Sequence, residues 1–110
     1  MKKQILNITC SAGVFEVSGE IFSGHGVTVF IHKFPRSSSW CISELSTGLR
    51  ILRSGDYFPA MQQTVAKGKA GIVFAANALV SNPDWCQEIA YARDYNLKHG
   101  GKIVNKEHEA

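Results

Sequence analysis

The sequence has few of the residues and runs that mark special classes of protein. Its cysteines, Cys10, Cys41 and Cys86, are odd in number and widely spaced, which argues against a disulfide framework. Three prolines and ten glycines exclude a collagen-like or proline-rich chain. No apolar run approaches the roughly 18–20 residues of a membrane span, and the first one is interrupted too early for a signal peptide. We therefore expect a reduced, cytoplasmic protein that does not contact membranes.

Patterns for metal binding and catalysis are also missing. No two cysteines or histidines have the C-x-x-C or H-x-x-x-H spacing that is typical of zinc sites. There is no G-x-S-x-G elbow and no G-K-[ST] phosphate loop. Gly24-His25-Gly26 is an isolated G-x-G that precedes an expected strand, so it predicts a hairpin turn. We predict no metal, no cofactor and no enzymatic activity.

The composition is that of an ordinary small domain. The chain has 110 residues, of which 45% are hydrophobic and 19% charged, a balance that excludes a disordered acidic or basic chain. A chain of this length forms one domain and can bury a hydrophobic core without disulfides. We expect a single domain over residues 1–101, followed by a flexible, charged tail over residues 102–110.

The first half of the chain has the pattern of strands. Residues alternate between apolar and polar over much of this half, and short turns with glycine at positions 11–13 and 46–48 separate the alternating runs. The segment 27–34 is apolar on both faces, which predicts a central strand. The pattern predicts an antiparallel meander of four or five strands, at 4–10, 14–22, 27–34, 40–45 and 49–52.

The second half has the pattern of helices. Pro59 and Gly68 predict a helix over 59–67, since proline suits the first turn and glycine the position after the last. Residues 70–80 are ambiguous between helix and strand, and helix is favoured. Asn82, Pro83 and Asp84 supply a cap, an early proline and an acid for a last helix. The fold class is therefore α+β, with the meander packed against two or three C-terminal helices.

The periodicity also predicts which side chains form the core. The apolar positions face one another across the expected sheet and helices. They are Ile8, Phe15, Val17, Val29, Ile31, Ile42, Leu49, Ile51, Met61, Val65, Phe74, Leu79, Trp85 and Ile89.

Positive charge is concentrated in the middle of the chain. The formal net charge is +3, and the segment 33–69 alone carries six basic and two acidic residues. Aromatic residues are interleaved with these charges, a combination that can pair with phosphates and stack on bases. The candidate surface for nucleic acid, or for another partner, is Lys33, Arg36, Trp40, Arg50, Arg53 and Tyr57.

The order of elements over residues 27–67 resembles that of small DNA-binding modules. Three strands followed by a helix, with Trp40, Gly48 and the basic residues of this region, are similar to the plant AP2 domain and the arm domains of phage integrases. The resemblance implies a sheet face that contacts DNA. It transfers no individual binding residue, because it is a likeness of fold alone.

Two other functions stay open at this point. A protein-interaction module, such as an adaptor or an inhibitor, needs only an exposed apolar patch, for which Phe34, Trp40, Tyr57 and Phe58 are candidates. An enzyme would need Cys41, His32 and Glu44 to meet on neighbouring strands, and this is the least favoured reading. A homodimer is also compatible with a chain that has an exposed strand at the edge of its meander.

Overall fold

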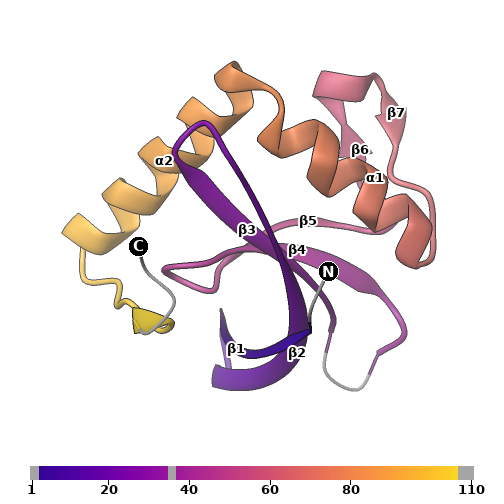
Figure 1. Cartoon of the computed structure of the whole chain (residues 1–110). Helices are drawn as coiled ribbons and strands as arrows, with labels where there is room; N and C mark the ends of the chain where they lie inside the picture. The colour runs from indigo at the N-terminus through magenta and orange to yellow at the C-terminus, as the bar shows by residue number, and fades with distance from the viewer. Residues whose placement is uncertain (1–2, 35–36, 107–110) are drawn as a thin grey trace.

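The fold is an antiparallel sheet covered on one face by two helices (Figure 1). It is a computed structural model that describes residues 3–34 and 37–106, so Arg36 of the candidate surface lies outside the described residues. The sheet has five strands in their order along the chain, which is a meander. These are β1 (Gln4–Cys10), β2 (Gly13–Gly24), β3 (Val27–Lys33), β4 (Trp40–Glu44) and β5 (Arg50–Arg53). The predicted α+β class is confirmed.

The two helices lie on the same side of the sheet (Figure 1). Helix α1 (Lys69–Val80) packs on β2, β3 and β4, and α2 (Pro83–Lys98) packs on α1 and β3. The side chain of Asn82 accepts hydrogen bonds from the N–H groups of Asp84 and Trp85, as the capping pattern predicted. The ambiguous segment 70–80 is helical, as favoured. No helix in the described part of the chain is long and apolar enough to cross a membrane.

The predicted helix over 59–67 is wrong. A short 3-10 turn, η1 (Pro59–Met61), connects β6 (Tyr57–Phe58) to β7 (Gln63–Thr64), and these two strands form a separate hairpin. Gln62 has a φ of +52°, which reverses the chain after one turn and stops a helix from propagating. Without that helix, the order of elements departs from the three-strand-plus-helix modules that the sequence resembles.

Strand β3 is central and is buried on both faces, as its sequence predicted. Val27, Val29 and Ile31 face the helices and pack in the larger core with side chains such as Ile72 and Leu79. On the opposite face, Phe30 packs in a second, smaller core, together with Leu6, Ile8 and Leu45. We call these the helix-side core and the far-side core. The far-side core exists because the sheet curls, which brings β1 into contact with β5 and packs Leu6 and Ile8 against Phe30 on the face that carries no helix (Figure 1).

The curl is closed by contacts between β1 and the turn that joins β4 to β5. The backbone N–H of Thr9 donates to the carbonyl of Gly48 at 2.9 Å, and the Thr9 hydroxyl donates to the carbonyl of Thr47 at 2.7 Å. Gly48 has a φ of +70°, and a Cβ there would meet the Asn7 carbonyl oxygen at 2.8 Å. Only glycine allows this close approach without strain.

Part of the C-terminal segment after residue 101 is packed against the same closure. The side chain of Asn105 is 2% exposed, and its Oδ1 accepts from the N–H of Asn7 at 2.8 Å. Its Nδ2 donates to the carbonyls of Asn7 at 2.9 Å and of Leu45 at 2.7 Å. These hydrogen bonds, with those of Val104 to Asn7 and Ser46, join residues 104 and 105 to the sheet, and residues 107–110 of the predicted tail lie outside the described residues.

Two predicted core residues are exposed. Phe74 is 59% exposed because α1 buries the stripe formed by Ile72, Ala75, Ala76, Leu79 and Val80, to which Phe74 does not belong. Phe15 is 41% exposed although it pairs with the buried Ile8. The other predicted core residues are buried or partly buried.

Candidate functional site

The sheet divides the predicted binding surface between its two faces. Lys33 pairs with Trp40 across β3 and β4, and both lie on the helix side, where Trp40 packs against the core. The next residue, Cys41, pairs with Arg53. Because successive side chains of a strand point to opposite faces, Arg53 lies on the far side. Trp40 and Arg53 therefore do not form one platform.

Two lysine side chains lie close to the ring of Trp40. Lys33 Nζ lies 5.6 Å and Lys69 Nζ 5.9 Å from its centroid, within the range of cation–π contacts. Lys69 also forms an ion pair with Glu20 at 2.6 Å, which lowers the pKa of the Glu20 carboxyl. The Trp40 ring is therefore half-buried and covered by two lysine ammonium groups, so it is not a free surface on which bases can stack.

The apolar patch expected for a protein-interaction module is also not assembled. Phe58 is fully buried and makes an edge contact with the Trp85 ring, with the centroids 5.4 Å apart. Phe34 and Trp40 are half-buried. Tyr57 is well exposed, but it belongs to the separate β6–β7 hairpin.

The structure does bring Arg50 and Arg53 together on one face. Cys41 pairs with Arg53 and Ser43 pairs with Arg50, so β5 has one more residue than β4 between these pairs. Residues that lie two apart on β4 share a face, so both partner arginines lie on the far side. The bulge makes this possible although the arginines are three residues apart on β5. Both are exposed. Within residues 3–34 and 37–106, neither guanidinium is in an ion pair.

A pocket with both polar and apolar lining residues opens beside Arg50 on this far side. It has a volume of about 350 Å³ and lies between the end of β1, with Ile8, and the residues Phe34 and Gly48. Its lining also contains His32 and Ser43, which are each 1% exposed. The sequence pattern does not predict this pocket, because β1 reaches it only through the curl of the sheet.

His32 and Ser43 form a buried, fully paired hydrogen-bond unit. Nδ1 of His32 lies 3.0 Å from the carbonyl oxygen of Lys33, and Nε2 lies 2.8 Å from Ser43 Oγ. A carbonyl can only accept, so Nδ1 carries the proton and the Ser43 hydroxyl donates to Nε2. Burial lowers the pKa of His32, which favours this neutral form.

The catalytic arrangement considered for Cys41, His32 and Glu44 is not formed. His32 and Cys41 are register partners, whereas Glu44 pairs with Val29 and so lies on the helix side. Burial raises the pKa of the Cys41 thiol, which disfavours the nucleophilic thiolate.

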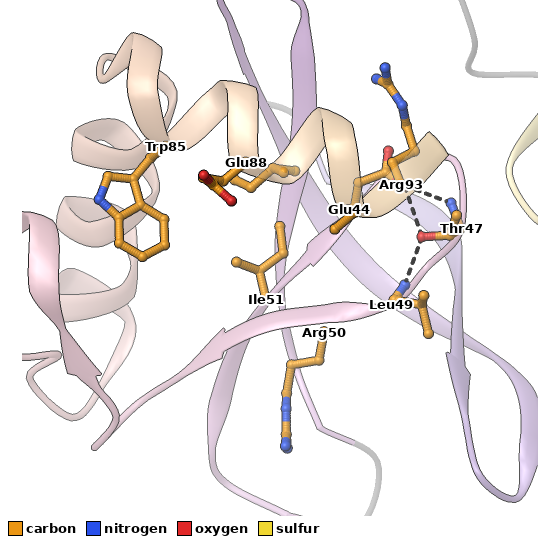
Figure 2. Close-up of a pocket in the computed structure, with 10 residues that line it drawn as sticks. Glu44, Thr47, Leu49, Arg50, Ile51, Trp85, Glu88 and Arg93 are labelled. Atoms are coloured by element: carbon orange, nitrogen blue, oxygen red, sulfur yellow. Dashed lines mark hydrogen bonds between the residues drawn. The ribbon is translucent and has the colours of Figure 1, made fainter. Parts of the chain in front are cut away.

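Glu44 instead holds the turn between β4 and β5. Its carboxylate accepts a hydrogen bond from the N–H group of Ser46 at 2.9 Å. It also accepts from the N–H group of Thr47 at 3.0 Å and from the Thr47 hydroxyl at 2.8 Å; Figure 2 shows Glu44 and Thr47. A buried carboxylate with three donors is a structural element of the turn. This acid therefore does not offset the positive charge of the far side.

A second surface follows α2. A groove of about 370 Å³ runs between β5 and α2 and is lined by Ile51, Trp85 and Ile89 among others. Arg50 extends from β5 away from α2 (Figure 2). Past this groove, the rings of Tyr91, Tyr95 and His99 stack along the helix, with centroid distances of 6.4 and 4.1 Å.

This row of rings was not among the candidate residues predicted from the sequence. Tyr91 and Tyr95 are 70% and 56% exposed. The spacing of four residues from Tyr91 to Tyr95 and on to His99 was the available signal, because it marks one face of a helix outside the apolar stripe.

The described residues were also compared with the arrangements that hold metal ions and with known proteins. The described part of the chain contains no cluster of three His, Cys, Asp or Glu side chains placed to hold a metal ion. No family model, curated protein or solved structure matches this chain.

Proposed function

We propose that this protein is a non-enzymatic binding module that contacts the backbone of single-stranded nucleic acid with the far side of β5. Arg50 and Arg53 are the residues that pair with phosphates. The observation that carries the proposal is the bulge in β5, which puts two exposed arginines on the same face, neither of them in an ion pair with another described residue. Guanidinium groups bind phosphate oxygens through two parallel hydrogen bonds.

The surroundings of the arginines also support the proposal. Glu44 and Asp56 are the acids nearest in sequence to Arg50, one on each side, and the carboxylate of Glu44 is buried in the turn. Asp56 uses its carboxylate to accept the backbone N–H of Arg53 at 2.8 Å. The Arg50 end of β5 is therefore the more positive end.

The pocket beside Arg50 favours a single strand over a duplex. Its volume of about 350 Å³ and the half-buried ring of Phe34 in its wall suit an unstacked base. Bases of a single strand are free to leave their stack, and aromatic side chains bind them with little sequence preference. In this arrangement Arg50 holds the phosphate next to the inserted base.

The test is a salt titration of binding to a labelled, mixed-sequence single-stranded oligonucleotide by fluorescence anisotropy. Each phosphate contact on a single strand contributes about −0.7 to the slope of log K against log salt. The double variant Arg50→Gln/Arg53→Gln therefore reduces the magnitude of the slope by about 1.4. The matched control is Lys67→Gln/Lys106→Gln, which removes the same charge from exposed positions outside β5.

The outcomes separate clearly. Binding that weakens with salt, with a reduced slope in the arginine variant and the wild-type slope in the control, supports the proposal. The same loss in both double variants would show that only net charge matters and would refute a β5 site. Absence of binding at low salt, or tighter binding to a duplex of the same sequence, would also overturn the proposal.

A further inference from the structure

The exposed face of α2 has an ordered charge pattern. Glu88, Tyr91, Tyr95 and Lys98 follow one another at spacings of three, four and three residues, which places them on one face of the helix. All four are exposed. The acid lies before the two tyrosines and the base after them. An antiparallel helix with the same sequence therefore presents its base opposite the acid and its acid opposite the base.

Contacts within the described chain leave this face without partners for its charges. Neither Glu88 nor Lys98 is in an ion pair within residues 3–34 and 37–106. Asp84 precedes Glu88 by one helical turn and adds a like charge, which is unfavourable in the isolated helix. The basic end of α2 has Lys98 and the stacked ring of His99.

We propose that this face binds the same face of a second copy of the chain, with the two α2 helices antiparallel. A two-fold axis near residue 93 brings Tyr91 of one copy against Tyr95 of the other. The same axis brings Glu88 of one copy opposite Lys98 of the other, and symmetry forms each contact twice. Spacings of three and four residues are those by which antiparallel helices interlock.

Charge complementarity identifies a second copy as the occupant. An unrelated partner would need a matching surface of its own, whereas α2 already carries the acid and the base in the order that an antiparallel copy requires. The antiparallel arrangement also places the positive end of each helix macrodipole beside the negative end of the other. Leu49 and Ala92, which lie beside Tyr91 and Tyr95, provide an apolar border for the contact.

The expected dimer is weak. Helix α2 has 16 residues. A helix of this length spans about 24 Å at 1.5 Å per residue, so one helix pair forms a contact at the small end of specific interfaces. We expect a dissociation constant in the micromolar range, where a change in one charged pair alters the average mass that sedimentation measures.

The test is sedimentation equilibrium of charge-reversal variants over a range of micromolar concentrations. The wild type rises with concentration from 12.1 kDa towards twice that mass. Glu88→Lys alone and Lys98→Glu alone each place like charges together at two symmetric positions, and each lowers the association constant at least tenfold. An equimolar mixture of the two variants restores association, because both opposed pairs become complementary in the heterodimer.

Two controls make the result specific. Glu16→Lys makes the same charge change at an exposed position of β2 and leaves association unchanged. Tyr95→Ala removes the central ring and abolishes association, and circular dichroism verifies that its helices are intact. Far-side nucleic-acid binding does not depend on this contact, so Arg50→Gln/Arg53→Gln leaves the mass distribution unchanged.

Three results would overturn the inference. The first is a mass of 12.1 kDa at every concentration of the wild type. The second is association that Glu88→Lys and Lys98→Glu do not weaken. The third is a mixture of the two variants that associates no better than either variant alone.

Discussion

Replacing Asn105 by alanine tests whether the C-terminal segment is part of the folded domain. Its side chain joins β1 to the segment after β4 through three hydrogen bonds, to the N–H and carbonyl of Asn7 and to the carbonyl of Leu45. Asn105→Ala removes all three and leaves these backbone groups without partners. The separate bond from Asn7 Nδ2 to the carbonyl of Val104 does not involve the altered side chain.

The magnitude follows from the number of lost bonds. A hydrogen bond contributes about 0.5–1.5 kcal/mol net, and a buried group left unpaired costs about 1–3 kcal/mol. The Asn7 groups are partly buried and regain some water, so we expect a loss of about 2–4 kcal/mol in the free energy of unfolding. With an unfolding entropy of about 2.1 cal/mol/K per residue, this lowers Tm by roughly 9–17 °C.

The assay is urea unfolding followed by tryptophan fluorescence, with thermal unfolding by circular dichroism as a second probe. Lys106→Ala, an exposed neighbour, is the matched control and changes the free energy by less than about 0.5 kcal/mol. Asn105→Asp keeps an acceptor for the Asn7 N–H but turns a carboxylate oxygen towards two carbonyls, so it is at least as destabilising as alanine. A loss below about 0.5 kcal/mol in Asn105→Ala would refute the packing of this segment.

Two further predictions concern buried polar groups. Burial lowers the pKa of His32 below its usual 6.5, so the unfolded chain binds a proton that the folded chain does not. The free energy of unfolding therefore falls as pH drops below about 6.5, and His32→Gln reduces this dependence on pH. Equal slopes in urea titrations of wild type and His32→Gln between pH 7 and 5 would contradict this. Glu44→Gln replaces one of the accepting oxygens by a donor and costs about 1.5–3 kcal/mol by urea unfolding, against a negligible change for the exposed Glu16→Gln. A negligible change in both would show that the turn does not need the carboxylate.

Local patterns predicted the elements of regular structure well. Strand β1 matches its predicted bounds, β3 is central as its two apolar faces indicated, and α2 begins at the predicted cap of Asn82. The helix over 59–67 failed because the local signals at Pro59 and Gly68 carry no information about the buried Phe58 and Val65, which anchor an extended hairpin.

The candidate site was less predictable than the fold. The sequence indicated a basic region, and the prediction put Trp40 and Arg53 in one surface. In the structure they lie on opposite faces of the sheet, because Arg53 pairs with the residue that follows Trp40 on β4. The pairing of Arg50 with Arg53 on one face depends on a bulge, and no residue type marked its position in advance. The row of tyrosines on α2 could have been found from helical spacing alone.

The sequence by itself determined that an antiparallel meander precedes the helices, that β3 is central and that α2 starts at the Asn82 cap. These features depend on the alternation of neighbouring side chains and on capping groups, which act over a few residues. Only the tertiary structure decided that the sheet curls onto Gly48, that Asn105 seals the closure, and that Arg50 and Arg53 share a face. Those features depend on register and on contacts between residues far apart in the chain, which local patterns do not encode.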